Sequence, residues 1–137
     1  MRVLIGTINE DVSLDAQPAK IFSTARAFLI YETNTKQFYS IKNTFYGAKE
    51  PHIAKDLKDL GIDNIIVEDI CIGCYENLKR EGIEIWEDKD SIYLRESLQK
   101  FELGGLFVKP RPKNFTMHKI LEESHEPSLE EELKQYN

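Results

Sequence analysis

The sequence has little cysteine, proline or glycine, and it has no long apolar run. Only two of its 137 residues are cysteine, five are proline and seven are glycine. A disulfide between two cysteines three positions apart would add little to the stability of the fold, and nothing in the sequence indicates export. No segment approaches the roughly 20 apolar residues that a membrane helix needs, and the start of the chain lacks a signal-peptide pattern. We therefore expect a cytoplasmic protein with reduced thiols and no membrane partner.

Positive charge is scarce as well. The chain has 18 Lys and Arg against 24 Asp and Glu, for a net charge of −6. Much of the excess lies at the C-terminal end, where residues 118–137 contain six glutamates and two lysines. Nucleic-acid binding needs clustered basic side chains that neutralise several phosphates. No basic face emerges apart from Lys109, Arg111 and Lys113 around two prolines, so nucleic acid is not an expected partner.

The composition is that of a globular domain, with 41% hydrophobic and 31% charged residues. Pro110 and Pro112 mark the end of its apolar patterning. We expect one compact domain over residues 1–108 and a separate acidic segment over residues 109–137. Leu129 and Leu133 lie four apart in that segment, which is compatible with a short amphipathic helix.

The hydrophobic pattern predicts three strands followed by alternating helices and strands. The connections between the first three strands are too short for helical crossovers, so these strands should form an antiparallel meander. The later βαβα order should add parallel strands, with helices on both faces. The prediction is an α/β fold with three layers and a mixed sheet. The expected strands cover residues 2–8, 27–32, 37–42, 65–67, 83–86 and 106–108. The expected helices cover residues 49–60 and 91–101, with a short helical segment between them whose face begins at Tyr75 and Leu78 and which Gly82 ends.

Two of these helices carry a specific expectation about their ends and faces. In the helix over residues 49–60, the apolar spacing places Ile53, Leu57 and Leu60 on one buried face. In the helix over residues 91–101, Asp90 or Ser91 is expected to cap the N-terminus.

Cys71 and Cys74 are the most informative residues of the chain. They follow the predicted strand over residues 65–67 and lie at the start of a helix, and ligands of open α/β sheets collect outside the carboxyl ends of the strands. The free N–H groups and the dipole of a helix N-terminus stabilise a thiolate, the form that binds metal. The two-residue spacer lets both sulfurs face one ion.

Two sulfurs supply only half of a tetrahedral ligand set. His52 is the best intrachain candidate for a further ligand. The alternatives are His118, His125, a bound substrate cluster, or a second subunit in a homodimer. Two other interpretations of the pair stay open: two small residues that fill a strand–helix junction, and a dithiol redox pair. The residues around the pair do not match the thioredoxin-type motif.

Residues 57–86 follow the pattern LxxLGIDxIIxxxIxxxxxxxLxxxGIxIW, after a strand–loop–strand opening that contains AFLIYE. With these residues the chain resembles the dinitrogenase iron–molybdenum cofactor biosynthesis family over roughly residues 1–106. The resemblance implies a ribonuclease-H-like fold. It also implies a non-enzymatic protein that binds or carries iron–sulfur-based cofactor precursors.

The sequence departs from that family at two motifs. Family members often carry His-Phe-Gly-Arg before the second strand, with the histidine implicated in cofactor binding, where this chain has Ile21-Phe22-Ser23-Thr24. They often carry Ile-Gly-Pro where this chain has Ile72-Gly73-Cys74. We expect the cofactor site at Cys71, Cys74, Gly73 and His52, with the two thiols as the metal ligands.

The resulting hypothesis is binding or carriage of an iron–sulfur cluster or an iron–molybdenum cofactor precursor, with zinc as the alternative metal. The expected partners are proteins that donate or accept the cluster. The first strand carries no acidic residue, so the nuclease chemistry of ribonuclease-H-like folds is not expected. The rival hypotheses are a thiol–disulfide redox protein that uses Cys71 and Cys74, and an interaction module that acts through its acidic C-terminal segment.

Overall fold

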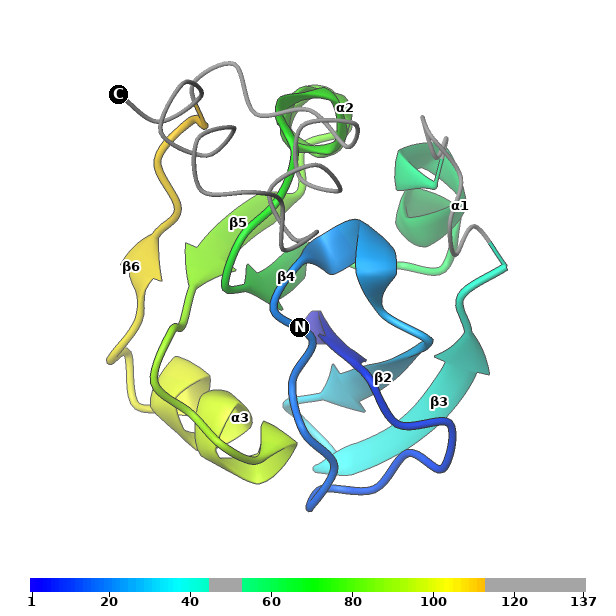
Figure 1. The fold of residues 1–137 in the computed structure, drawn as a ribbon, viewed down its shortest axis with the longest axis vertical. Coiled ribbons are helices and arrows are strands. Elements are labelled where there is room, and N and C mark those ends of the chain that lie inside the picture. The colour runs from blue at the N-terminus through cyan, green and yellow to red at the C-terminus, as the bar shows by residue number, and fades with distance from the viewer. Residues whose placement is uncertain (45–52, 113–137) are drawn as a thin grey trace, which may run out of the picture.

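The chain forms one mixed six-stranded sheet in a computed structural model that describes residues 1–44 and 53–112. The strands lie in the order β3-β2-β1-β4-β5-β6 (Figure 1). β1, β4 and β5 run parallel, whereas β2 and β6 run antiparallel to their neighbours, as does β3 to β2. The predicted antiparallel meander and the parallel half that follows it are therefore confirmed. The strands are β1 (Arg2–Thr7), β2 (Ala27–Glu32), β3 (Gln37–Lys42), β4 (Asn64–Val67), β5 (Glu84–Glu87) and β6 (Phe107–Val108).

Helices cover both faces of the sheet and produce three layers (Figure 1). The helices are η1 (Phe22–Thr24), α1 (Ala54–Asp59), α2 (Ile72–Arg80) and α3 (Leu94–Glu102). Successive side chains of a strand point to opposite faces, so Leu4 of β1 joins the apolar cluster under α1 and α2, whereas Val3 and Ile5 join the cluster under α3. This alternation explains why the central strands are apolar throughout.

The end of β1 packs against the segment that follows η1. A Cβ atom built on Gly6 would lie 2.7 Å from the Cβ of Ala25. Only glycine fits this approach without a shift of the backbone, because real Cβ contacts are longer. The absence of a side chain at Gly6 therefore lets the connection between β1 and β2 pack closely against the carboxyl end of β1.

Two sequence-based expectations about the helices are wrong in detail. Leu60 is 38% exposed, because α1 ends before it and the chain turns at Gly61 so that Ile62 is buried instead. The expected start of that helix over residues 49–52 lies outside the described residues. α3 begins at Leu94 behind an N-cap at Tyr93 and not at Asp90 or Ser91.

The carboxylate of Glu96 accepts the N–H groups of Ile92 and Tyr93, which satisfies donors ahead of α3. The buried side chain of Asp88 stabilises the turn between β5 and α3. Its carboxylate accepts hydrogen bonds from the hydroxyls of Ser91 and Ser97 at 2.6 and 2.7 Å. Ser91 thus contacts Asp88 and does not cap the helix.

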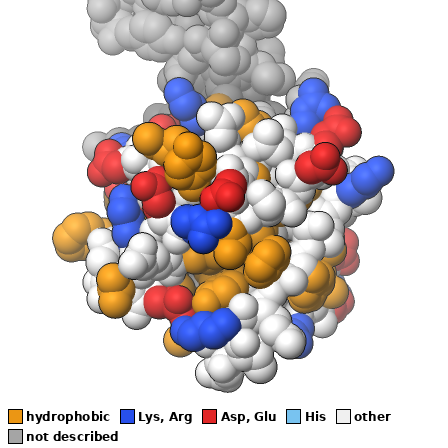
Figure 2. Space-filling model, turned by 90° about the horizontal axis from the view of Figure 1, so that it is seen from below, with side chains coloured by type: hydrophobic (Ala, Val, Ile, Leu, Met, Phe, Trp, Pro, Cys, Tyr) orange, Lys and Arg blue, Asp and Glu red, His pale blue; other side chains and the backbone are white. Residues whose placement is uncertain are grey.

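Charged side chains of both signs are interspersed with apolar side chains on the face that Figure 2 shows. Within residues 1–44 and 53–112, none of the helices has the length and apolar character that a membrane crossing requires. The acidic segment over residues 113–137, with its predicted amphipathic helix, lies outside the described residues.

Candidate functional site

The two cysteines lie where β4 passes the chain to α2. β4 ends at Val67, and four residues later Cys71 takes an extended conformation (φ −72°, ψ 156°) as the N-cap of α2. Cys74 follows in the first turn of the helix. Because β4 lies between the parallel strands β1 and β5, this junction is at the carboxyl ends of the parallel strands. The predicted position of the pair in the fold is confirmed.

The two thiols affect each other's protonation. The Cys74 thiol and the backbone N–H groups at the start of α2 lower the pKa of Cys71 from 9.0 to about 6, although burial opposes the shift. The neighbouring Cys71, together with burial, raises the pKa of Cys74. Cys71 is therefore the cysteine of the pair that loses its proton first.

Both cysteines are shielded by the protein, whereas the turn between them is open. Each cysteine is 4% exposed and belongs to the apolar cluster under α1 and α2. Gly73 is exposed, and a Cβ atom built on it would meet nothing within 4 Å. Gly73 is therefore the part of this junction that faces solvent.

The segment that precedes β2 lies beside this junction. The N–H of Phe22 donates to the carbonyl of Asp69 at 2.9 Å, and the N–H of Asp69 donates to the carbonyl of Lys20 at 2.8 Å. Ile21 pairs with Asp69 in an isolated parallel bridge and packs against the cluster that contains both cysteines. Ile21 and Cys71 are therefore neighbours in the fold. Position 21 is where the resemblance places a cofactor-binding histidine in other members of the family.

Lys109 is a buried residue of this corner that the sequence analysis assigned to the C-terminal segment. Its side chain is 8% exposed, and its ammonium lies 2.6 Å from the carboxylate of Glu87 and 3.2 Å from that of Asp69. It also donates to the carbonyl of Glu68. Burial by itself would lower the pKa of Lys109, but the two carboxylates raise it above the usual value.

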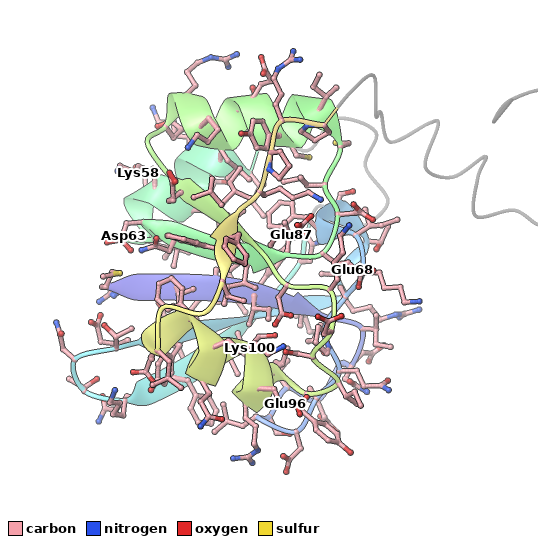
Figure 3. All side chains as sticks on the ribbon, turned by 90° about the vertical axis from the view of Figure 1, so that its left-hand side faces the viewer. Lys58, Asp63, Glu68, Glu87, Glu96 and Lys100 are labelled. Carbon is pink, nitrogen blue, oxygen red and sulfur yellow. The ribbon has the colours of Figure 1, made fainter. Side chains whose placement is uncertain are left out.

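Figure 3 shows Glu68 and Glu87 at one end of the sheet, with Asp63 at the other end. Lys109 also connects to the cysteine helix, because the hydroxyl of Tyr75 donates to its carbonyl at 3.3 Å. No local pattern in the sequence marks Lys109, since its partners precede it by 22 and 40 positions. The only sequence feature that distinguishes Lys109 is its place between an apolar strand and Pro110.

The described residues offer two sulfurs and no further ligand at this site. Among residues 1–44 and 53–112, no group of three or more His, Cys, Asp and Glu side chains is arranged to hold a metal ion. His52, His118 and His125 lie outside the described residues. A two-sulfur site fits a cargo that brings its own ligands or shares them with another chain, because a closed zinc site needs four.

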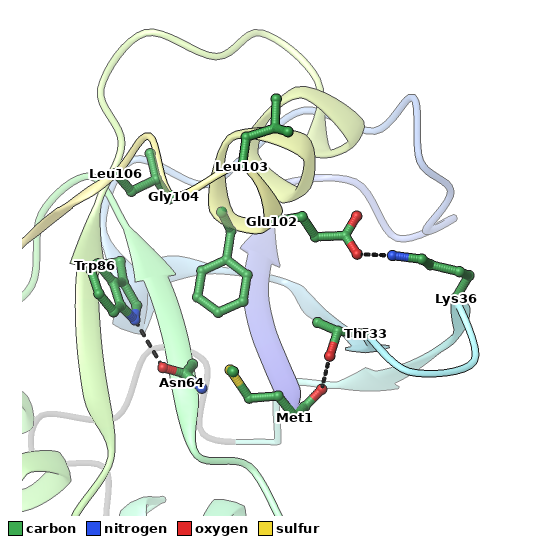
Figure 4. A pocket seen from close by; sticks show the side chains of 10 residues that line it. Met1, Thr33, Lys36, Asn64, Trp86, Glu102, Leu103, Gly104 and Leu106 are labelled. Carbon is green, nitrogen blue, oxygen red and sulfur yellow. Dashed lines mark hydrogen bonds and ion pairs between the residues drawn. The ribbon is translucent and has the colours of Figure 1, made fainter.

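A cavity of about 760 Å³ opens at the opposite end of the sheet (Figure 4). It lies between the start of β1, the start of β4 and the end of α3, and of the predicted site residues that the structure describes, Cys71, Gly73 and Cys74, none lines it. The indole N–H of Trp86 donates to the side-chain oxygen of Asn64 at 2.9 Å in its wall, and Lys36 pairs with Glu102 at its rim. Its lining is mostly apolar and lacks the chemistry of a metal site.

Comparisons with known proteins agree with the overall fold. A family model described as dinitrogenase iron-molybdenum cofactor matches residues 1–104. The NMR structure of a NifB-related protein from Thermotoga is 24% identical, with a TM-score of 0.68 over 78% of this chain and 91% of that chain.

The apo form of the orange protein from Desulfovibrio gigas is 18% identical, with a TM-score of 0.71 over 82% of this chain and 95% of that chain. These two likenesses show a shared fold. No curated protein matches the sequence.

Proposed function

We propose that this chain, which belongs to the dinitrogenase iron–molybdenum cofactor family, binds an iron–sulfur cluster or an iron–molybdenum cofactor precursor as a transient cargo. Cys71 and Cys74 are its sulfur ligands in this proposal. Membership of the family supports a cofactor-related accessory role. The choice of ligands rests on the sulfur pair at the start of α2.

The observation that carries the proposal is the environment of the Cys71 sulfur. Cys71 is the N-cap of α2, and the start of this helix together with the Cys74 thiol lowers the pKa of Cys71 to about 6, which favours the thiolate. A thiolate is the form that binds iron and zinc. When an ion takes the place of the shared proton, the Cys74 sulfur can become the second ligand.

The strand order supports the finer assignment of the fold. A sheet ordered β3-β2-β1-β4-β5, with β2 alone antiparallel to the strands on its two sides, is the arrangement expected of a ribonuclease-H-like fold. β6 extends that sheet at its edge. In this fold the loops after β1 and β4 meet at one edge, where we place the cargo.

The neighbourhood of residue 21 supports the same site. The resemblance places a cofactor-binding histidine where this chain has Ile21, and Ile21 lies beside Asp69, two residues before Cys71. We propose that the two thiols replace that histidine from the adjacent loop. Gly73 would let the cargo approach the backbone of the turn, since no side chain covers it.

The cargo needs ligands beyond the two sulfurs. A preassembled cluster brings its own sulfide, and a second copy of the chain would supply two more cysteines for a four-thiolate site. His52 is a further candidate ligand. The protein contributes binding and orientation without a bond-making step, so we propose no enzymatic activity; its partners are the proteins that donate and accept the cargo.

Spectroscopy with metal analysis tests the proposal. The full chain is purified without oxygen, offered iron and sulfide, and compared with a Cys71→Ser/Cys74→Ser protein whose thermal unfolding is checked first. We expect sulfur-to-iron charge-transfer bands and bound iron in the unmodified protein only. One cluster per two chains would identify the homodimer arrangement. Equal iron or zinc binding by both proteins would refute Cys71 and Cys74 as ligands.

A further inference from the structure

We infer that Cys71 and Cys74 form a reversible dithiol–disulfide couple, which a low-molecular-weight disulfide oxidises to an intrachain bond. The couple itself requires no cargo. Its consequence, release of the cargo when both ligands are consumed, rests on the proposed function.

The first support is the contact between the two sulfurs. Cys71 is the N-cap and Cys74 lies in the first turn of α2, so the backbone of one helix end holds both. Their sulfurs are already within hydrogen-bonding reach of each other. Bond formation between them closes a small ring and needs no rearrangement of distant elements. Within the described residues these are also the only two cysteines, and both are free.

The second support is the difference between the two sulfurs. Cys71 is the N-cap of α2, where the free N–H groups of the first turn favour a thiolate, whereas Cys74 lies inside that turn. A thiol–disulfide exchange needs one sulfur that attacks and one that resolves. These positions assign the attack to Cys71 and the resolution to Cys74.

The third support is the pattern of exposure. Gly73 is exposed with open space around it, and Ile72 is half-buried, so a small reagent reaches the junction over this turn. The two free cysteines lie three positions apart at one helix end, so each has the other as its nearest sulfur within the described residues. This placement favours the intrachain bond over a disulfide-linked dimer.

The exchange is balanced as follows. The Cys71 sulfur attacks one sulfur of the external disulfide, whose bond breaks and releases one thiolate. Cys74 then loses its proton to solvent and attacks the Cys71 sulfur, so the mixed disulfide breaks and a second thiolate leaves. The cysteine pair loses two electrons, and the external disulfide gains them.

The test uses the metal-free full chain in buffers with graded ratios of reduced to oxidised glutathione, followed by alkylation and intact-mass measurement. We expect a species that is lighter by two hydrogen atoms and takes up no alkylating reagent. A dithiol reductant should convert it back to the chain with two alkylatable thiols. A chain that keeps two alkylatable thiols in the most oxidising buffer would overturn the inference, as would disulfide-linked dimers as the main product.

Two single variants test the assignment of roles. Cys74→Ser keeps a hydroxyl donor beside Cys71 and should accumulate a glutathione adduct. Cys71→Ser should form its adduct at least ~10-fold more slowly, because Cys74 lacks the N–H donors that surround Cys71. Thermal unfolding confirms that both variants fold. Equal adduct rates would overturn the assignment of roles.

The cargo-release step is measured separately on iron-loaded protein. Loss of charge-transfer absorbance in step with disulfide formation is expected, and persistence of the bands after complete oxidation would refute the release step. If the chain never loads iron while the metal-free couple still forms, the proposed function fails and the redox couple stands.

Discussion

The ammonium of Lys109 lies 2.6 Å from a carboxylate oxygen of Glu87, and the same ammonium reaches Asp69. One buried positive charge thus joins the carboxyl end of β5 to the loop that leads into the cysteine pair. The carbonyl of Lys109 accepts the hydroxyl of Tyr75 in the first turn of α2. Residues just after β6 therefore hold the start of the cysteine helix in place.

Removal of this charge should destabilise the fold. Lys109→Met keeps much of the side-chain volume but leaves two carboxylates without their shared partner, and we expect a loss of about 2 kcal/mol in the free energy of unfolding. Lys79→Met is the matched control, because Lys79 pairs with Glu84 on the surface. Exposed pairs contribute at most about 1 kcal/mol. Urea unfolding that gives equal losses for both variants would contradict the role assigned to Lys109.

The reactivity of the cysteines should have an unusual pH dependence. Because the pKa of Cys71 is about 6, its thiolate forms as the pH rises through that value, well below the ordinary value of 9.0. Thiolate absorbance in the ultraviolet should therefore rise by one thiol equivalent around pH 6 in the metal-free protein. The Cys71→Ser variant should lack this step. A single titration step near pH 9 for both thiols would contradict the arrangement of donors around Cys71.

Two glycine substitutions should have opposite effects on stability. Gly6→Ala places a methyl group 2.7 Å from the Cβ of Ala25, and overpacking of this kind costs about 1–3 kcal/mol. Gly73→Ala meets nothing within 4 Å at the start of a helix and should stabilise the protein by up to about 1 kcal/mol. Urea unfolding of both variants measures the difference.

Gly73→Ala also separates folding from cargo binding. The proposed approach of the cargo to the turn predicts weaker iron loading by this variant even though its fold is at least as stable. Unchanged loading would show that the cargo does not contact the backbone at Gly73.

Asp88 should contribute to stability in a pH-dependent way. Burial tends to raise its pKa, but hydrogen bonds from Ser91, Ser97 and the N–H of Asp90, together with the charge of Lys100, outweigh this effect and lower the pKa of Asp88 below its ordinary value of 3.8. A carboxyl whose pKa is lower in the folded state stabilises fully above its unfolded pKa, and the contribution is lost as the pH falls through the folded value. Asp88→Asn should cost about 1–2 kcal/mol at pH 7.

The deficit of Asp88→Asn should begin to shrink below about pH 4, where the carboxyl of the unfolded chain takes up its proton, and should shrink further as the pH falls through the lower pKa of the folded protein. Thermal unfolding from pH 7 to pH 3 follows this change. Asp90→Asn is the control with the same change of formal charge, because Asp90 is exposed. A deficit that stays constant with pH would contradict the role of the Asp88 carboxylate.

Local patterns in the sequence were enough to predict the elements and the position of the thiols. Alternating apolar residues and short connections define the meander, and the apolar run before Cys71 predicts a strand that delivers both sulfurs to a helix start. The proximity of Cys71 and Cys74 is also predictable from the local sequence, because a spacing of three positions at the end of a helix brings two side chains together. Helix ends were less predictable: Leu60 is exposed because Gly61 turns the chain one residue earlier than the periodicity indicates.

The sequence by itself therefore determined the fold class, the sulfur pair and its place at the end of a strand, since these depend on neighbours within a few positions. Only the tertiary structure decided what surrounds the pair. The strand order brings Ile21 beside Asp69, 48 positions along the chain, and Lys109 to carboxylates that precede it by 22 and 40 positions. Such contacts depend on the register of the whole sheet, and no local preference of Lys109 indicates that its charge is buried.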